Sequence, residues 1–548
     1  MRLSAFTGAA QLLPAAGVPL FEEINPAASG IAWIHENAMS DRRHLPETLG
    51  PGCAFLDYDN DGWMDLLLVN SGPCDFYQPK QRLRHALYKN NRDGTFRDVT
   101  DAAGLTAELF AMGVVVADYD NDGFPDILIT SYGKPVLYHN NGDGTFKDVT
   151  AAAKLDAPGW TTSGVWLDYD GDGRLDLFLC SFVQYGKESL TCGDNKLGRN
   201  YYCIPRVFKP TANFLFHNNG DGTFTEVSKG TDIQKALGKG LGVVTTDVNN
   251  DGRLDLFVAN DTVQNFLFVN RGANKWEEAA LSAEVGFSDN GQARSGMGVD
   301  SADVDGDGWE DLFVANVDQE MFSLYKNNKN ETYSDVSHRY NVAQPTRLLS
   351  GWGLKFFDYD NDGRPDLILA NGHPDDMIES YSQQVRYREP LLLFHNEDGK
   401  FRNVSAEAGP VFSKAFSARG LAVGDYNNDG KIDVLLANNG AAPALLKNVS
   451  GGDNHWIGLR LQGVKANRDA IGAKLTISVA GVRRSRLKTQ GGSYLSSHDP
   501  REVFGLGKAA KLDYVEVKWP APSGLVERFF DLPPDRYSPV TEGKGKRL

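Results

Sequence analysis

The sequence predicts an all-β fold: a seven-bladed β-propeller in which an N-terminal strand closes the last blade, followed by a small C-terminal β-sandwich. Two observations support this. A motif of closely spaced aspartates occurs seven times at intervals of 50 to 79 residues, and each copy lies between short apolar runs of strand length. The 58 glycines in 548 residues fit a protein rich in turns. Repeated units of four short strands are typical of propeller blades.

The repeated motif has the pattern D-x-[DN]-x-D-G-x-x-D. Its copies are DYDNDGWMD from Asp57, DYDNDGFPD from Asp118, DYDGDGRLD from Asp168, DVNNDGRLD from Asp247, DVDGDGWED from Asp303, DYDNDGRPD from Asp358 and DYNNDGKID from Asp425. Carboxylates this close repel one another unless a cation lies between them. Ca²⁺ takes about six to eight oxygen ligands from tight loops, so the motif predicts up to seven calcium sites and disfavours Mg²⁺.

Five positions of each motif are the predicted ligands. Positions 1, 3, 5 and 9 offer side-chain oxygens, whereas position 7 varies in type and offers its backbone carbonyl. The predicted ligands are Asp57, Asp59, Asp61, Trp63, Asp65, Asp118, Asp120, Asp122, Phe124, Asp126, Asp168, Asp170, Asp172, Arg174, Asp176, Asp247, Asn249, Asp251, Arg253, Asp255, Asp303, Asp305, Asp307, Trp309, Asp311, Asp358, Asp360, Asp362, Arg364, Asp366, Asp425, Asn427, Asp429, Lys431 and Asp433. The two loops with asparagine at position 3 have one carboxylate fewer, so we expect weaker binding there.

The other motif positions fit a tight loop. Position 6 is always glycine, and position 4 is asparagine or glycine, as left-handed backbone requires. Position 2 is tyrosine or valine, which can pack beneath the loop. Turn formation alone would explain one such motif but not seven. Seven calcium ions would change the formal charge of −16 to −2, and the acidic balance argues against nucleic acid as a partner.

Each motif lies between the first two of four predicted strands. A glycine stands five residues before the first aspartate in six copies, with Ser163 in the third, which fits a strand crowded at the propeller axis. The seventh unit ends at 444–448 without a fourth strand, and LFEEI from Leu20 would supply it. This N-terminal strand would close the ring and remove an exposed edge. A β-solenoid is the alternative, although its repeats are usually shorter and more uniform.

We divide the chain into an N-terminal extension (1–19), a propeller (20–452) and a β-rich tail (453–548). The tail contains WIGLRLQ, AKLTISV and YVEVKWP, runs that alternate as strands of a compact sandwich do. The extension has one basic residue and a weakly apolar stretch, so it would be a weak leader. No apolar run approaches the ~20 residues needed to cross a bilayer, which argues against an integral membrane protein.

The five cysteines leave the redox compartment open. Cys192 and Cys203 flank a short polar loop and could form a disulfide, which would place the protein in an oxidising compartment. The alternative is five unpaired thiols in a cytosolic protein. We expect an extracellular or periplasmic location.

The motifs resemble the FG-GAP/VCBS calcium-binding repeats of integrin α-subunits. The tail stretches DNHWIGLRLQG, NRDAIGAKLTI, TQGGSYLSSHD, VFGLG and VEVKWPAPSG are similar to the ASPIC/UnbV domain of the cartilage-acidic-protein-like family. The stretches GIAWIHENAM, LPETLGPG and YYCIP are also similar to that family, so the resemblance covers nearly the whole chain. It implies an exported calcium-binding propeller with a small β-rich tail.

Propeller topology predicts where recognition would occur. The motif loops and the turns between strands three and four lie on one face, and the long insertions 71–85, 182–212 and 372–390 lie on the opposite face. Extended loops on a rigid scaffold are common recognition sites. This opposite face would also collect ionisable residues, which are His35, Glu36, Glu47, Asp261, Asp318, His373, Asp375 and Asp376. They could form a second metal site or an acid/base pair, or they could be ordinary solvated loop residues.

Two functions fit these observations. The first is a non-catalytic interaction or adhesion scaffold that recognises a protein or glycan on the insertion-bearing face. The second is an enzyme of polysaccharide or secondary-metabolite chemistry with its site on the same face near the axis. No nucleophile elbow, Walker loop, dinucleotide fingerprint or HExxH motif occurs, so we assign no catalytic residue and favour the scaffold. A deep axial pocket with perturbed carboxyls near His35 or His373 would favour the enzyme.

Overall fold

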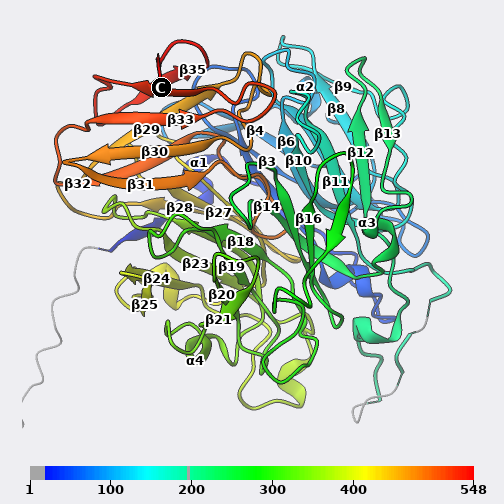
Figure 1. Cartoon of the computed structure of the whole chain (residues 1–548). Helices are drawn as coiled ribbons and strands as arrows, with labels where there is room; N and C mark the ends of the chain where they lie inside the picture. The colour runs from blue at the N-terminus through cyan, green and yellow to red at the C-terminus, as the bar shows by residue number, and fades with distance from the viewer. Residues whose placement is uncertain (1–18, 190, 194–197) are drawn as a thin grey trace, which may run out of the picture.

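The computed structural model describes residues 19–189, 191–193 and 198–548; the predicted N-terminal extension, apart from residue 19, lies outside the described residues. Within these ranges the strands form seven four-stranded antiparallel sheets and two further sheets (Figure 1). The predicted all-β propeller fold is therefore confirmed. We call the four-stranded sheets units 1 to 7, in the order of their aspartate motifs.

In units 1 to 3, four consecutive strands pair in chain order. Unit 1 consists of β2 (Cys53–Leu56), β3 (Asp65–Leu68), β4 (Ala86–Asn90) and β5 (Phe96–Asp98). Unit 2 consists of β6 (Phe110–Ala117), β7 (Asp126–Tyr132), β8 (Val136–Asn140) and β9 (Phe146–Asp148). Unit 3 consists of β10 (Thr161–Leu167), β11 (Asp176–Ser181), β12 (Phe214–Asn218) and β13 (Phe224–Glu226).

Units 4 to 6 repeat this order. Unit 4 consists of β14 (Gly240–Thr246), β15 (Asp255–Asn260), β16 (Phe266–Asn270) and β17 (Trp276–Glu278). Unit 5 consists of β18 (Val299–Ala302), β19 (Asp311–Val314), β20 (Ser323–Asn327) and β21 (Tyr333–Asp335). Unit 6 consists of β22 (Gly351–Phe357), β23 (Asp366–Asn371), β24 (Leu392–Glu397) and β25 (Lys400–Asn403).

Unit 7 is completed by the N-terminus of the chain, as the sequence predicts. Its strands are β26 (Ala418–Gly424), β27 (Asp433–Asn438), β28 (Ala444–Asn448) and β1 (Phe21–Glu23). β1 pairs antiparallel with β28, with Phe21 opposite Asn448. The Phe21 side chain is fully buried among rings of units 6 and 7. The first strand of the chain and the last three strands of the propeller thus share one sheet, so the edge of β28 is paired.

An asparagine at the end of each third strand links neighbouring units. Asn140 of unit 2 donates from Nδ2 to the carbonyl of Tyr58 in unit 1 (2.8 Å) and to that of Pro125 in its own loop (3.1 Å). Asn90 of unit 1 donates in the same way to the carbonyl of Tyr426 in unit 7 (2.8 Å), so the links form a closed ring. The seven asparagines are Asn90, Asn140, Asn218, Asn270, Asn327, Asn396 and Asn448.

The first strand of each unit lies closest to the axis, where glycine is needed for space. A Cβ at Gly52 would lie 1.9 Å from the carbonyl oxygen of Leu495, and one at Gly298 would lie 1.7 Å from that of Trp352. Both distances are shorter than any real contact, so a larger residue would move the backbone. Ser163, the exception in unit 3, uses its hydroxyl to donate to the carbonyl of Leu241 (2.6 Å).

The tail folds as two sheets around its own core. A three-stranded sheet contains β32 (Glu502–Gly507), β29 (His455–Gln462) and β35 (Tyr537–Thr541). A five-stranded sheet contains β31 (Val482–Leu487), β30 (Lys474–Val479), β33 (Tyr514–Lys518), β34 (Val526–Phe529) and β36 (Lys546–Arg547). Apolar side chains of both sheets, including those of Ile457 and Val515, form one buried cluster. Figure 1 shows these strands, in orange and red, gathered on one side of the units.

A tail segment enters the propeller axis, which sequence analysis did not predict. Residues 488–501, between β31 and β32, are defined here as the axial segment. It hydrogen-bonds to the first strand of every unit through backbone and side-chain atoms. The bonds link Ser497 to Cys53, Leu495 to Val114 and Ser163, Gln490 to Thr245, and Ser493 to Val299, Leu354 and Leu421. These bonds satisfy strand edges that would otherwise face an open channel.

Short helices occupy the connections. The α-helices are α1 (Pro26–Ser29), α2 (Thr100–Ala103), α3 (Asp232–Lys235) and α4 (Ala343–Thr346). The 3₁₀ helices are Leu45–Thr48, Pro205–Val207, Ile378–Ser380 and Pro410–Ser413. We call residues 24–52, between β1 and β2, the N-terminal segment. Three of the 3₁₀ helices lie in this segment or in the insertions, which are the parts of the chain that cover one end of the axis.

Candidate metal centres and the insertion face

The seven aspartate loops share one backbone geometry. In unit 1 the two carboxylate oxygens of Asp57 accept from the amides of Asp61 (2.9 Å) and Gly62 (2.8 Å). Asp61 in turn accepts from the amide of Trp63 at position 7 (3.0 Å). The same bonds recur in every unit from position 1, whose residues are Asp118, Asp168, Asp247, Asp303, Asp358 and Asp425. The motif spacing therefore sets the loop conformation.

The small residues of the loops adopt the backbone conformation that the sequence predicts. Gly62 at position 6 has φ +86° and Asn60 at position 4 has φ +54°, both left-handed. The Asn60 side chain also donates from Nδ2 to the carbonyl of Gly123 in the next loop (2.7 Å). Equivalent bonds join other neighbouring loops, but Gly171 and Gly306 lack the side chain for it. The asparagine at position 4 thus both adopts the left-handed conformation of the turn and links neighbouring loops.

The aspartate at position 9 is buried in every unit. Asp65 is fully buried; it accepts from the amide of Tyr58 through Oδ2 (3.3 Å) and from that of Asn90 through Oδ1 (2.7 Å). Burial, with the nearby charge of Asp57, raises the pKa of Asp65 to about 8. Burial likewise raises the pKa of Asp176 to about 9. Burial therefore disfavours the charged form of these two carboxylates, and a nearby positive charge would offset that cost.

Ligand atoms converge in these loops as a metal requires. One ligand atom from each of Asp57, Asp59 and Asp61 lies within 4.8 Å of the others, and Asp118, Asp120 and Asp122 form a similar group. Oδ1 of Asp59 is buried without a hydrogen-bond partner. Several close oxygens of this type are the donor set that Ca²⁺ takes. The ligand roles assigned to the 35 predicted residues remain predictions.

The tail covers the face that carries the aspartate loops. Arg501 donates to the backbone carbonyl of Asp425 (2.6 Å), and the Tyr537 hydroxyl donates to Oδ2 of the same residue (2.8 Å). Lys474 donates to Asn250 (2.8 Å), and Arg468 lies 3.5 Å from the carboxylate of Asp118. Basic side chains of the tail thus neutralise part of the acidic loop face.

A cavity of about 510 Å³ lies between the tail and this face. Its wall includes an ion pair between Asp300 of β18 and Lys355 of β22 (2.7 Å) and, from the tail, Lys488 and Glu502. Asp300 and Lys355 each stand three residues before the first aspartate of their motif. The other units have an apolar residue at this position, for example Val115 in unit 2. The cavity is on the aspartate-loop side of the axis, not on the face where sequence analysis expected a binding site.

The three insertions meet on the opposite face, which we call the insertion face. Arg43 pairs with Asp376 of 372–390 (2.8 Å) and contacts the hydroxyl of Tyr202 in 182–212 (3.3 Å). Asp75 of 71–85 accepts from the backbone amide of Lys187 in 182–212 (2.5 Å). Insertions from units 1, 3 and 6 are therefore joined across the axis, as the sequence predicts for loops on one face.

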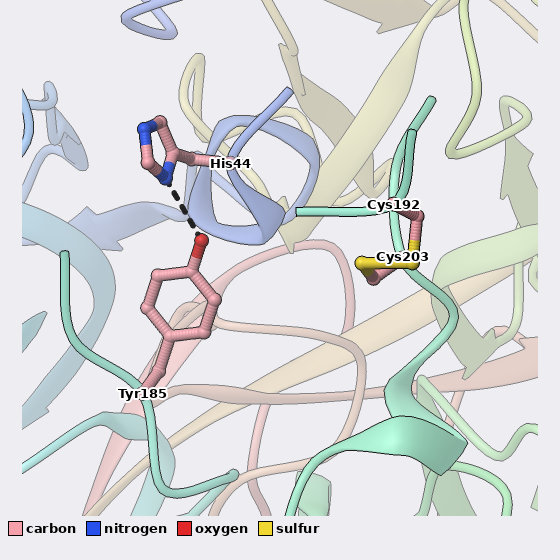
Figure 2. Close-up of a disulfide and its surroundings, with 4 residues drawn as sticks. All are labelled: His44, Tyr185, Cys192 and Cys203. Carbon is pink, nitrogen blue, oxygen red and sulfur yellow. Dashed lines mark hydrogen bonds between the residues drawn. A yellow bond between two sulfur atoms is a disulfide. The ribbon is translucent and has the colours of Figure 1, made fainter. Parts of the chain in front are cut away.

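The suspected disulfide is present in the second insertion. Cys192 and Cys203 are bonded, with 5.2 Å between their Cα atoms. Figure 2 shows this disulfide beside the short helix after His44, whose ring nitrogen bonds to the hydroxyl of Tyr185 (2.9 Å). The His44 ring also stacks on Phe76 with 4.4 Å between ring centroids. The insertion is therefore held by one covalent bond and by contacts to the N-terminal segment.

The ionisable residues expected on this face do not form one site. His373 lies 3.2 Å from Asp318, but its other ring nitrogen accepts from the amide of Asp375 (3.0 Å), so both nitrogens are used. His35 is buried and accepts from the amide of Gly440 (3.1 Å); burial lowers its pKa to about 3. These contacts give the two histidines structural roles.

The carboxylates of this face are also held by protein contacts. Glu47 and Asp376 are linked, because the Tyr202 hydroxyl that donates to Glu47 also contacts Arg43, the ion-pair partner of Asp376. Glu47 accepts from the Tyr202 hydroxyl (3.0 Å), and Glu36 accepts from the amide of Ala38 (3.1 Å). Asp261 is buried, and burial, with the charge of Glu320, raises its pKa to about 7.

The axis is closed at the insertion face. Tyr494 of the axial segment is fully buried; its hydroxyl donates to the carbonyl of Leu49 (2.9 Å) and its ring packs edge-on against Trp352 at 4.9 Å. Arg419, also fully buried, lies over the Trp352 ring at 4.1 Å. Sequence analysis missed Tyr494 and Arg419, because neither lies in a repeated motif.

The outer surface of the insertion face is partly apolar. Ile34 and Met39 of the N-terminal segment are 62% and 50% exposed. Ile204 of the second insertion and Tyr381 of the third are each 58% exposed. Exposed apolar side chains beside charged ones are typical of protein-binding surfaces.

Two family models match the chain. The FG-GAP-like repeat model matches residues 57–129, 118–179, 207–258, 247–314 and 303–369, which together span just over half of the chain. The ASPIC and UnbV model matches residues 463–547. Four of the five stretches of the first match each contain two aspartate loops, and 207–258 contains one. The second match covers most of the tail, including the axial segment.

Curated relatives of the chain include two vertebrate proteins. Cartilage acidic protein 1 of Xenopus tropicalis is 25% identical over 356 residues, which are 59% of this chain and 51% of the relative. Cartilage acidic protein 1 of Homo sapiens is 25% identical over 360 residues, which are 61% of this chain and 50% of the relative. The chain thus spans about half the length of the curated relatives it matches.

Similar solved structures include a lectin and a peptide complex. BP39L lectin from Burkholderia pseudomallei is 11% identical, with a TM-score of 0.44, and the match covers 74% of this chain and 98% of that one. YCF48 bound to D1 peptide is 12% identical, with a TM-score of 0.41, and the match covers 81% of this chain and 100% of that one. Among the described residues of this chain, no helix is long and apolar enough to span a membrane.

Proposed function

Because the chain belongs to the FG-GAP-like repeat family and also carries an ASPIC and UnbV domain, we propose that it is a calcium-binding propeller that acts as an interaction scaffold. One observation carries this proposal. The tail covers the aspartate-loop face, whereas three insertions and the N-terminal segment form the exposed insertion face. The first face would then serve stability and the second recognition.

Calcium binding is supported by the loops themselves. Each brings carboxylates together around buried oxygens, and the pKa of the position 9 aspartate lies well above its ordinary value because of burial. Positions 1, 3, 5, 7 and 9 would hold the ion, as in the sequence prediction. When bound, calcium would supply the positive charge that the buried carboxylates lack.

Recognition of a protein or glycan would use the insertion face. Its apolar side chains Ile34, Met39, Ile204 and Tyr381 are exposed, and the same face carries the Arg43–Asp376 ion pair, a combination that suits a protein surface or a sugar ring. The filled axis, and the use of both ring nitrogens of His373 in protein contacts, favour this function over the enzymatic alternative. The disulfide supports an oxidising location, extracellular or periplasmic.

A binding screen tests the proposal. The intact protein, with calcium present, is applied to a panel of purified glycans and extracellular proteins, and Ile204→Asp and Tyr381→Ala are tested against the ligands found. Both variants should lose at least tenfold in affinity with an unchanged melting temperature, because both side chains are exposed. Leu281→Asp, at a residue 69% exposed outside the insertions, is the matched control. Equal binding by all variants would place recognition elsewhere.

A further inference from the structure

The seven aspartate loops differ at one position that is outside the motif. The residue just before the linking asparagine of the third strand lies beside loop carboxylates of its own unit in units 1, 2, 3, 5 and 6. It is histidine in units 2, 3 and 6, lysine in units 1, 5 and 7, and valine in unit 4; these residues are His139, His217, His395, Lys89, Lys326, Lys447 and Val269. The family match does not distinguish the loops in this way.

In units 2, 3 and 6 the imidazole lies between two loop carboxylates. Nδ1 of His139 is 3.2 Å from Oδ2 of Asp120 and 3.3 Å from Oδ1 of Asp126. Nδ1 of His217 is 3.3 Å from Asp170 and 3.2 Å from Asp176. These two nitrogen atoms are buried and have no hydrogen-bond partner with acceptable geometry.

Unit 6 repeats the arrangement. Nδ1 of His395 is 3.1 Å from Oδ1 of Asp366 and 3.8 Å from Oδ2 of Asp360. Each of the three histidines therefore faces positions 3 and 9 of its own loop, the positions that sequence analysis assigns to metal ligands. In each unit the imidazole and two carboxylates can offer ligand atoms within 4.8 Å of one another.

In units 1 and 5 protein cations take the equivalent place. Lys89 pairs with Asp59 and lies 3.2 Å from Asp61, which also pairs with Arg92 (3.0 Å). In the sequence, the lysine is accompanied by a second basic residue three positions later. The stretch that starts at the lysine reads KNNRDG in unit 1 and KNNKNE in unit 5, whereas the stretch that starts at the histidine reads HNNGDG in units 2 and 3.

Unit 5 has the same two cations. Lys326 pairs with Asp305 and lies 2.9 Å from Asp307, and Lys329 lies 3.3 Å from Asp307. Loops 1 and 5 thus carry two basic side chains each, whereas loops 2 and 3 have histidine and a glycine. The two loop types differ in both charge and donor atoms.

Ligand chemistry separates the loop types. Ca²⁺ takes oxygen ligands, whereas imidazole with carboxylates suits first-row transition ions such as Zn²⁺. With ligand distances of about 2.1 Å, two ligand atoms on one such ion lie about 3.0 to 3.4 Å apart. The two nitrogen–oxygen distances in unit 2, the two in unit 3 and the one to Asp366 in unit 6 are 3.1 to 3.3 Å and match this separation, whereas the distance from His395 to Asp360 is longer, at 3.8 Å.

We propose that the loops of units 2, 3 and 6 are mixed imidazole–carboxylate sites that take a first-row divalent transition ion in preference to calcium. The loop of unit 4, where Val269 offers no donor, is an oxygen-only calcium site. In loops 1 and 5 the lysine competes with a metal ion and weakens its binding. This inference rests on the proposed metal binding by the loops and adds which ion each loop selects.

Metal stoichiometry of the intact chain tests this inference. Protein stripped with a chelator is dialysed against Zn²⁺ with excess Ca²⁺, and bound metals are counted by elemental analysis. Wild type should retain three zinc ions per chain. His139→Val, His217→Val and His395→Val, each introducing the residue that unit 4 has at Val269, should each lose one, and Val269→His should gain one. His338→Val, at an exposed histidine outside the loops, should retain three.

Pulsed EPR with Mn²⁺ in place of zinc gives a second measurement: coupling to an imidazole nitrogen should disappear as the three histidines are replaced. Zinc binding unchanged by these substitutions, or calcium displacing all zinc from wild type, would overturn the selection of a transition ion while leaving calcium binding intact. Binding of neither metal would overturn both proposals. Because Val269→His adds a donor without removing one, it remains informative if a histidine variant fails to fold.

Discussion

Single polar side chains determine how the units of this propeller meet. The linking asparagines occur seven times in the sequence, at the end of each third strand, but this repeat does not reveal their hydrogen-bond partners. The structure shows that Asn140 bonds across the unit boundary to the carbonyl of Tyr58, a buried group with few alternatives. The sequence repeat predicts that these asparagines have a common structural role, whereas the acceptor of each hydrogen bond depends on how neighbouring sheets pack.

Replacing Asn140 should destabilise the ring. Asn140→Ala leaves the carbonyls of Tyr58 and Pro125 without this donor, which should cost about 2 to 4 kcal/mol of unfolding free energy. Denaturant unfolding measures the change. The neighbouring variant Asn141→Ala, which removes only an exposed bond to Thr145, should change stability by less than about 0.5 kcal/mol. Equal effects of the two would contradict the linking role.

Asp261 should make stability depend on pH. Its folded pKa of about 7 exceeds the unfolded value of about 3.9, so the folded state binds this proton more tightly, and stability falls as pH rises from about 4 to 7. Asp261→Asn removes that loss, which is at most about 4 kcal/mol. The melting temperature of the variant, relative to wild type, should therefore increase between pH 4 and pH 8. The exposed Asp41→Asn is the control, and a pH-independent difference would show that burial does not raise this pKa.

At the scale of elements, alternation and turn motifs predict most strands. The runs after each motif become second strands, and LFEEI becomes β1, because local patterning and a missing fourth strand leave one place for it. The axial segment could not be predicted in this way. TQGGSYLSSHD reads as an ordinary polar loop, and its bonds to first strands as distant as that of Cys53 follow only from the channel that seven units enclose.

Tyr494 should couple the tail to the propeller. Tyr494→Ala removes a fully buried ring packed on Trp352, at a cost of about 3 to 5 kcal/mol. Because the axial segment bonds to all seven first strands, wild type should unfold in one transition by both calorimetry and tryptophan fluorescence. Phe530→Ala, at a tail residue 45% exposed, should cost less than about 1 kcal/mol. Separate transitions for tail and propeller in wild type would contradict this coupling.

At the scale of the whole molecule, the two faces of the propeller differ: one carries the acidic loops and is covered by the tail, and the other carries the long insertions. The motif spacing predicts seven acidic loops on one face of the propeller. The positions of the insertions within the repeats predict that they lie on the opposite face. The sequence motif places every predicted ligand in a loop of common geometry, as the bonds of Asp57 to Asp61 and Gly62 illustrate. It could not predict that the tail covers the loops, because this contact depends on dispersed basic residues such as Arg501 and Lys474 rather than on a motif.

The most direct test of the central claim is a count of metal ions on the intact protein, with thermal melts before and after chelation. Several ions per chain, most of them calcium when only calcium is supplied, and a melting temperature that falls by more than about 10 °C on chelation and recovers with calcium are the predicted results. A chain that retains no calcium, and melts at the same temperature with and without a chelator, would show that the aspartate loops are only turns.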